Sequence, residues 1–432
     1  MITMERTWFD GAGLGMFVHW DPASQAGLEV SWPMVGGVFS LPHCQSVTPE
    51  AYWSQAATFD PQAWDPADLA HRARAAGMRY VVFTTRHHAG YSMWDTAQDD
   101  HKITNSPYGR DLLADLVVAL RAEGLRVGLY YSLSDWHHPD YPPFATEDLP
   151  YRFDRMTVAT DDQAERYRAY MMAQLRELLT NYGPIDVLWF DGQWERPAPW
   201  WHADEIAALA QSLQPGILIN DRLPGHGDFV TPEQFVPPQP LEGRWESCET
   251  INGSWGWNPD DPNLKSALQL VTTLCETVGR GGNLLLNISP RGDGSLPPEQ
   301  LERLDAITTW MERHHQAVHD VEPGLEPWQF YGPSTRAGSI IYLFAVLRPA
   351  EGITVRALPV RRVRSIRVLG TDQPLAFHTR AGVLDQLLED PEGEVFIEVP
   401  AEVLDPLVTV LMIELSDEPI DRAVLGRWES TR

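Results

Sequence analysis

The stretch that decides the fold is residues 185–194, which read Ile-Asp-Val-Leu-Trp-Phe-Asp-Gly-Gln-Trp. A short and mostly apolar run ends in the carboxylate of Asp191, and Gly192 follows it. This pattern indicates a buried strand and the loop that leaves it, with Asp191 at the carboxyl end of the strand. An Asp-Gly pair is also a common turn signal, so this stretch alone leaves open that Asp191 only begins a turn.

Strand-like and helix-like segments alternate around this stretch over about 300 residues, a pattern typical of parallel α/β proteins. The apolar runs that we expect to be strands are residues 15–20, 79–85, 126–132, 185–191, 216–220, 244–248 and 281–290. The expected helices are residues 64–77, 111–124, 160–182, 204–213, 264–278 and 298–315. With roughly eight strands, a closed (β/α)8-like (TIM) barrel is favoured. An open doubly wound sheet would carry a glycine-rich phosphate turn after its first strand, and the sequence has none there.

The pattern changes after about residue 323, where runs of β-branched and aromatic residues are separated by Gly and Pro turns. These runs are residues 339–346, 363–369, 395–399 and 408–415. They predict an antiparallel β-sandwich that follows the barrel. We therefore expect a catalytic barrel over residues 1–322 and a C-terminal β-sandwich over residues 323–432.

Composition limits the possible partners and location. The formal net charge of −27 argues against binding to nucleic acid or to anionic membranes, because phosphate binding needs clustered Lys and Arg. No apolar run approaches the roughly 18 residues of a membrane span. The first residues lack the basic and then apolar pattern of a secretory signal, so we expect a cytoplasmic protein. The sequence does not indicate an oligomeric state.

Polar and aromatic side chains gather just past the predicted strands, where a barrel collects its functional residues. They are His19, His87, His88, Tyr130, Trp189, Asp191, Arg222, Glu233 and Glu246. Carboxylates, imidazoles and an arginine suit the hydroxyls of a sugar, and Trp suits its ring.

A metal site is the rival interpretation. The pairs 87–88 and 137–138 are adjacent histidines, whose side chains we expect to diverge, and the other histidines have no ligand spacing. We therefore predict no metal and no cofactor.

Eight motifs, in order along the chain, resemble the α-L-fucosidase family of retaining glycoside hydrolases. They are GMFVHW (15–20), TRHHAGY (85–91), GLYYS (128–132), LWFDG (188–192), NDR (220–222), WESC (245–248), WGW (255–257) and GGNLLLN (281–287). The resemblance implies a (β/α)8-like barrel followed by a β-sandwich. It also implies hydrolysis of terminal α-L-fucose from fucosylated oligosaccharides, without a cofactor. Two alternatives remain, a non-catalytic fucose-binding homologue and a metal-dependent barrel hydrolase.

The resemblance also assigns expected roles. Asp191 matches the nucleophile of the family. The positions that match fucose contacts are His19, Glu29, Trp32, His87, His88, Tyr130, Trp189 and Arg222. Glu29 and Trp32 match more loosely, since two residues stand between positions that are often adjacent. Arg86 and Ala89 replace a lysine and an aspartate that we expect on either side of the His pair.

The acid/base has two candidates, Glu233 and Glu246. Residues 229–234 resemble members that act on branched α-1,3/1,4-linked fucose, and there the glutamate is the acid/base. We favour Glu233 because a residue on a mobile loop can approach the leaving group from the side opposite Asp191.

Overall fold

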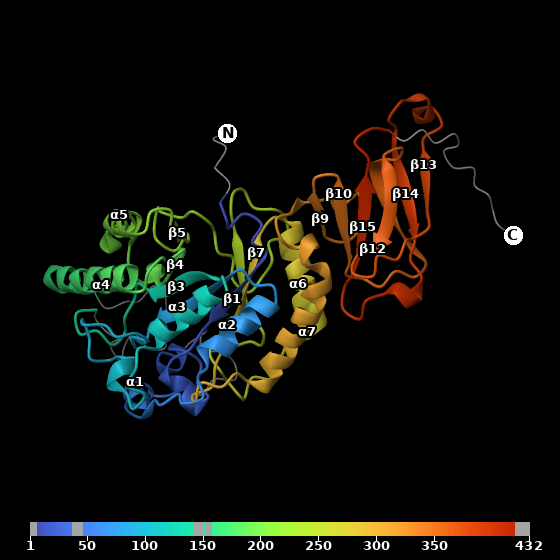
Figure 1. The fold of residues 1–432 in the computed structure, drawn as a ribbon. Coiled ribbons are helices and arrows are strands. Elements are labelled where there is room, and N and C mark those ends of the chain that lie inside the picture. The colour runs from blue at the N-terminus through green and yellow to red at the C-terminus, as the bar shows by residue number, and fades with distance from the viewer. Residues whose placement is uncertain (1–6, 37–45, 142–150, 152–157, 420–432) are drawn as a thin grey trace.

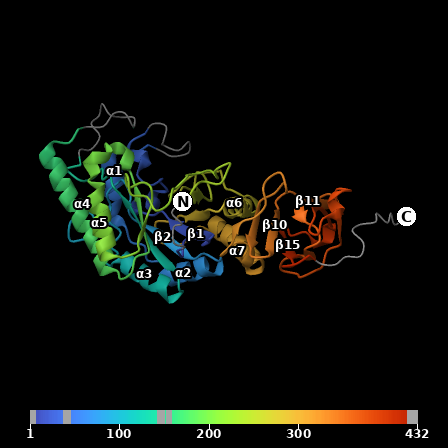
Figure 2. The same cartoon turned by 90° about the horizontal axis from the view of Figure 1, so that it is seen from above.

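The computed structural model describes residues 7–36, 46–141, 151 and 158–419. Figure 1 shows an elongated molecule with two parts, a barrel built by the first three quarters of the chain and a sandwich of strands beside it. The view from above in Figure 2 keeps the two parts side by side, with α6 and α7 between the barrel sheet and the sandwich. The architecture predicted from the sequence, a (β/α)8-like barrel followed by a β-sandwich, is confirmed.

The barrel is formed by a seven-stranded parallel sheet in the order β5-β4-β3-β2-β1-β7-β6. Its strands are β1 (Leu14–Val18), β2 (Tyr80–Arg86), β3 (Arg126–Ser132), β4 (Val187–Asp191), β5 (Leu218–Ile219), β6 (Glu246–Thr250) and β7 (Asn283–Ile288). All residues of β4 are buried, as its near-continuous apolar sequence predicts for a parallel strand covered on both faces. Asp191 is the last residue of β4, so the strand interpretation is correct and the turn interpretation is wrong.

An irregular segment, residues 229–233, lies between the two edge strands β5 and β6. Isolated parallel bridges pair Asn220 with Phe229, Val230 with Trp245, and Glu233 with Cys248. The amide of Glu246 donates to the carbonyl of Val230 at 2.9 Å, which continues the ladder. This segment takes the position of an eighth strand, and its Pro232 lacks the N–H that a regular strand would use. Glu233 is therefore the last residue of a segment held by β6, whereas the sequence suggested a mobile loop.

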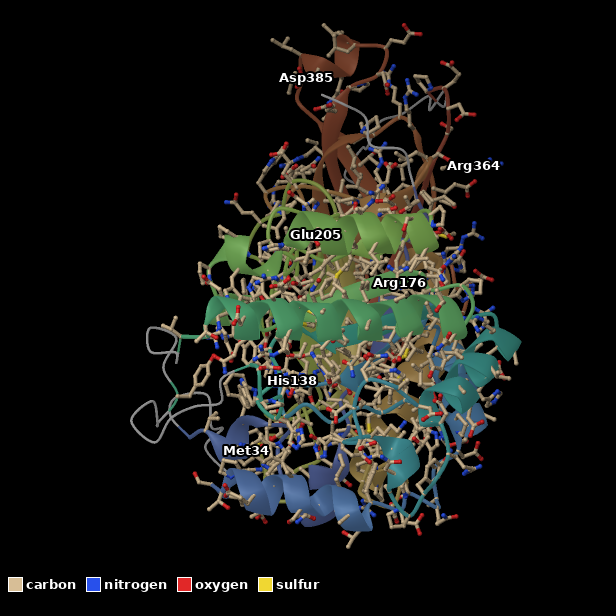
Figure 3. All side chains as sticks on the ribbon, turned by 90° about the vertical axis from the view of Figure 1, so that its left-hand side faces the viewer. Met34, His138, Arg176, Glu205, Arg364 and Asp385 are labelled. Carbon is tan, nitrogen blue, oxygen red and sulfur yellow. The ribbon has the colours of Figure 1, made fainter. Side chains whose placement is uncertain are left out.

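Helices cover the outside of the sheet. They are α2 (Pro66–Ala75), α3 (Leu112–Ala122), α4 (Asp161–Asn181), α5 (Ala203–Leu213), α6 (Ala267–Gly279) and α7 (Pro298–His314), with a short α1 (Pro49–Trp53) before them. Local sequence sets their starts: Thr160 and Ser266 each form a capping box with a glutamine three residues later. Figure 3 looks onto one side of the barrel, where α4 with Arg176 and α5 with Glu205 run side by side.

The C-terminal part is a sandwich of two antiparallel sheets, ordered β12-β15-β10-β9-β8 and β11-β14-β13. The strands are β8 (Glu322–Pro323), β9 (Ser334–Ala337), β10 (Ile340–Ala345), β11 (Gly352–Pro359), β12 (Val363–Val368), β13 (Phe377–Ala381), β14 (Glu392–Glu398) and β15 (Thr409–Leu415). The sequence analysis missed β8, β9, β11 and β13. The strands β8 and β9 have only two and four residues and form no apolar run. A register shift interrupts β11 between Val355 and Leu358, and β13 carries two exposed polar residues, so neither gives a clean apolar run.

The sandwich packs against α6 and α7 of the barrel. The indole of Trp310 on α7 donates to the carbonyl of Val408 at 2.8 Å, and Arg313 forms an ion pair with Asp405 at 2.7 Å. These contacts lie on the outer wall of the barrel. Among the described residues, no helix is both long and apolar enough to cross a membrane.

Candidate active site

A small, partly open cavity lies at the carboxyl ends of the barrel strands. It is lined by Phe17, His19, Trp32, His87, His88, Tyr130, Trp189, Asp191, Trp194, Arg222, Glu233 and Trp255. Parallel strands that close into a barrel bring their ends to one face, which is why side chains from β1 to β6 converge here. Of the predicted site residues, only Glu29 and Glu246 do not line this cavity.

Asp191 carries its carboxylate into the cavity from the end of β4. Its Oδ1 accepts from Nη1 of Arg222 at 2.7 Å, and its Oδ2 accepts from the hydroxyl of Tyr130 at 2.8 Å. Nε2 of His88 lies 3.7 Å from the same Oδ2. A cationic donor and a hydroxyl donor stabilise the carboxylate and fix its orientation. This is the environment that a carboxylate nucleophile needs.

Arg222 joins the two carboxylates of the cavity. While Nη1 bonds Asp191, Nη2 bonds Oε2 of Glu233 at 2.7 Å. Its guanidinium also lies 4.6 Å from the ring centroid of Trp189, and Nε donates to the hydroxyl of Thr231 at 3.2 Å. The side chain of Glu233 is 40% exposed, whereas that of Asp191 is 10% exposed. Glu233 therefore lies at the solvent side of the guanidinium and Asp191 at its inner side.

Three buried histidines line the cavity in neutral form. Burial, the largest cause, lowers the pKa of His19 to about 4 and that of His88 to about 3. Burial also lowers the pKa of His87 well below its ordinary value, and the neighbouring histidines lower it further. Each Nδ1 meets a polar side chain, in the pairs His19–Asn287 (2.7 Å), His87–Ser31 (2.6 Å) and His88–Ser132 (2.7 Å).

The adjacent residues His87 and His88 do not diverge, which corrects the prediction from the sequence. Their ring centroids are 4.1 Å apart, because both residues follow the last residue of β2 and no longer alternate as strand residues do. One atom from each of His87, His88 and Asp191 lies within 4.8 Å of the others, so these three residues have the geometry of a possible metal-ligand set. The guanidinium of Arg222 already supplies positive charge to Asp191 at 2.7 Å, which favours a neutral ligand over a cation.

Glu246 lies beneath the cavity and is buried. Its carboxyl accepts from the hydroxyl of Tyr80 and from the indole of Trp189, the latter at 3.1 Å. Burial raises the pKa of Glu246 to about 7, although both donors oppose this shift. Glu246 therefore supports Trp189, which itself lines the cavity.

Glu29 is also buried and does not reach the cavity. Its carboxyl oxygens accept the backbone N–H groups of Val30, Trp255 and Gly256 at 2.7–2.8 Å. Burial raises the pKa of Glu29 to about 7. The side chain thus ties the loop after β1 to the loop after β6, and Trp255 is fixed in the cavity wall as a result.

Sequence reasoning missed three aromatic residues of the cavity, Phe17, Trp194 and Trp255. The indole of Trp194 donates to the hydroxyl of Tyr151 at 2.7 Å, and the ring of Trp255 lies 4.8 Å from that of His19. Trp194 stands three residues past Asp191, and Trp255 follows β6. Their positions after the ends of strands could therefore have identified them as site residues. Phe17 lies inside β1 and gives no such signal.

An inner carboxylate held by an arginine, a second carboxylate on the same arginine, and a wall of imidazoles and indoles define a barrel glycoside hydrolase. The chain belongs to the alpha-L-fucosidase family, whose model matches residues 3–316. It is 30% identical over 419 residues to the tissue alpha-L-fucosidase of Homo sapiens, covering 91% of this chain and 84% of that protein.

Solved structures of fucosidases have the same fold. Alpha-L-fucosidase isoenzyme 1 from Paenibacillus thiaminolyticus is 34% identical with a TM-score of 0.82, over 95% of this chain and 98% of that one. The alpha-fucosidase of Thermotoga maritima, in complex with a mechanism-based inhibitor, is 28% identical with a TM-score of 0.75, over 94% and 96%.

Proposed function

We propose that this protein is a retaining α-L-fucosidase that releases terminal α-L-fucose from glycans. The observation that carries the proposal is the bridge formed by Arg222, which bonds Asp191 on one side and Glu233 on the other. Glycoside hydrolysis with retention needs two carboxyl groups close together, one as nucleophile and one as acid/base. The proposal is supported by two carboxyl groups that share one guanidinium and both line the cavity.

In the first step, Asp191 attacks the anomeric carbon of fucose and the bond to the leaving oxygen breaks. Glu233 gives its proton to that oxygen. Tyr130 and Arg222 hold the attacking carboxylate through the two bonds described above. The product of this step is a fucosyl ester of Asp191 and a free leaving group.

In the second step, Glu233 takes a proton from water, and the water oxygen attacks the anomeric carbon from the face that the leaving group vacated. Ester formation removes the negative charge of Asp191, so the guanidinium of Arg222 then balances Glu233 alone. Two inversions return the original anomeric configuration.

Glu233 is the better candidate for the acid/base than Glu246. Glu246 is separated from the cavity by Trp189 and uses its oxygens on Tyr80 and Trp189. The partly exposed Glu233 lies where a leaving group can reach it.

We also propose a preference for branched α-1,3/1,4-linked fucose, which rests on the resemblance of residues 229–234. The test measures fucose release from a Lewis-type trisaccharide, an α-1,2-linked fucoside and an aryl α-L-fucoside. We expect turnover of the aryl fucoside and faster hydrolysis of the Lewis-type sugar than of the α-1,2 isomer. No release from any of the three would contradict the proposed activity. Equal rates on the two natural linkages would contradict the preference alone.

A further inference from the structure

Ser31 occupies a strained and buried position next to the cavity. Its backbone has φ 62° and ψ −46°, a combination that residues other than glycine rarely adopt. Its amide donates to the hydroxyl of Tyr52 at 2.6 Å, and that hydroxyl donates to Oδ2 of Asp21 at 2.6 Å. Strained residues persist where the surroundings hold them, and they concentrate at functional sites. The contacts of the Ser31 side chain indicate what this position does.

The hydroxyl of Ser31 determines which nitrogen of His87 carries the proton. Ser31 Oγ accepts the N–H of Ala89 at 2.8 Å and lies 2.6 Å from Nδ1 of His87. Within the described part of the chain, the Ser31 hydroxyl has no acceptor other than this Nδ1. The hydroxyl hydrogen therefore lies between Oγ and Nδ1, because a buried donor without an acceptor is costly. His87 then carries its own proton on Nε2.

His88 has the opposite tautomer. Oγ of Ser132 is 2.7 Å from the carbonyl oxygen of Ser134, and since a carbonyl only accepts, the hydroxyl hydrogen lies between these two oxygens. Ser132 Oγ can then only accept, so Nδ1 of His88 donates to it at 2.7 Å. The hydroxyl of Ser134 is farther from this nitrogen, at 3.1 Å, and lies 3.1 Å from Ser132 Oγ. Nε2 of His88 therefore carries no proton and can only accept a hydrogen bond. It is buried, has no hydrogen-bond partner among the described residues, and lies 3.7 Å from Oδ2 of Asp191.

His19 has the same tautomer as His88. The amide group of Asn287 faces the carbonyl of Trp255 at 2.7 Å, so the atom on that side is the NH2 donor. Oδ1 of Asn287 consequently faces Nδ1 of His19 at 2.7 Å and accepts its proton. Nε2 of His19 therefore also carries no proton and can only accept a hydrogen bond.

We propose that Ser31 is a positioning residue that makes His87 a hydrogen-bond donor to the ligand, while His19 and His88 act as acceptors. The three Nε2 atoms then offer one donor and two acceptors to the hydroxyls of the bound sugar. A sugar hydroxyl can donate or accept. It donates its hydrogen to Nε2 of His19 or His88, and it accepts the N–H of His87 with a lone pair. This inference rests on the proposed function in taking the ligand to be a sugar.

The low pKa values of the three histidines support this assignment, since only a neutral imidazole has a distinct donor and acceptor nitrogen. The proposed role of Ser31 also accounts for the presence of two residues, Val30 and Ser31, between Glu29 and Trp32. The longer segment brings a hydroxyl against His87, and its strained backbone is held by the bond from the Ser31 amide to Tyr52. Trp32, the next residue, lines the cavity.

The direct test is neutron diffraction from a crystal of the whole protein exchanged into D2O near neutral pH. We expect deuterium on Nε2 of His87, and on Nδ1 of both His19 and His88. Deuterium on Nδ1 of His87 would overturn the proposal. This measurement does not depend on activity, so its outcome is separate from that of the fucoside assays.

Kinetics test whether the tautomer matters for binding. Ser31→Ala removes the hydroxyl, and Ser31→Gly removes it while also relieving the positive φ, so a folding defect in the first variant is recognised by the second. For both variants we expect KM for an aryl α-L-fucoside and Ki for free L-fucose to rise roughly tenfold, the effect of losing one oriented hydrogen bond, with kcat changed much less.

The matched control is Ser24→Ala, which removes another buried hydroxyl of the same loop. That hydroxyl bonds the carbonyl of Asp21 and the indole of Trp20, and it does not line the cavity. We expect KM and Ki of this variant to stay at the wild-type values. If the Ser31 variants matched Ser24→Ala in both constants, the positioning role would be wrong.

Discussion

Truncating the two candidate glutamates to alanine separates their roles sharply, because they lie in different surroundings. Glu233→Ala removes a carboxylate that faces the cavity and bonds Arg222. Glu246→Ala removes a buried carboxyl that accepts from Tyr80 and Trp189. The first change is expected to abolish proton transfer, and the second to weaken the support beneath the cavity.

The structure sets the expected magnitudes. In Glu246→Ala, two buried donors lose their acceptor at about 1–3 kcal/mol each, so we expect the free energy of unfolding to fall by about 2–6 kcal/mol. Glu233 is 40% exposed, and loss of its ion pair with Arg222 is expected to lower that free energy by at most about 1 kcal/mol. General acid–base catalysis contributes about 10²–10⁴-fold, which is the loss in kcat/KM that we expect for Glu233→Ala on an oligosaccharide.

The assay compares kcat/KM on a Lewis-type trisaccharide and on an aryl α-L-fucoside, with and without azide, alongside urea unfolding. An aryl group leaves with little protonation, so Glu233→Ala should lose more activity on the trisaccharide than on the aryl fucoside. Azide fits the vacated space and needs no base, so it should restore turnover of the aryl fucoside by Glu233→Ala. Rescue by azide in Glu246→Ala alone, with no rescue in Glu233→Ala, would refute the assignment.

Two further predictions follow from the charges of the site. Because Arg222 already neutralises Asp191, dialysis against EDTA should leave kcat/KM unchanged; loss of activity that a divalent ion restores would favour the metal interpretation. Burial raises the pKa of Glu246 from 4.5 to about 7, so the folded state binds this proton more tightly than the unfolded chain does. As the pH rises from 4.5 to 7, this difference lowers the free energy of unfolding of the wild type. Glu246→Gln has no such titrating group, so its free energy of unfolding should rise by about 3 kcal/mol relative to that of the wild type between pH 4.5 and 7. Urea unfolding measures both proteins, and parallel pH profiles would contradict the prediction.

Local sequence was sufficient to predict the strands of the barrel and the residues at their carboxyl ends. The apolar run before Asp191 and the motifs around His19 and Arg222 each identify a strand end, and barrel geometry then brings strand ends together. The burial of Glu29 could not be predicted in this way. Its partners are the backbone amides of Trp255 and Gly256, more than 200 residues away, and no local pattern encodes that pairing.

The position of Glu233 shows a second limit. Gly and Pro around it suggested a loop, while the structure pairs its backbone with that of Cys248 in β6. The pairing depends on where the edges of β5 and β6 meet, which sequence pattern does not specify. The cytoplasmic location and the catalytic roles of the site residues stay predictions.

The measurement that tests the central claim most directly is trapping of the covalent intermediate. Wild-type protein is incubated with a 2-fluoro-fucosyl fluoride, whose fluorine slows hydrolysis of the ester, and is then digested and analysed by mass spectrometry. We predict one fluorofucosyl group per chain on the peptide that contains Asp191, and no adduct in Asp191→Ala. An adduct on a different residue, or turnover of the reagent with inversion and without any adduct, would contradict the account.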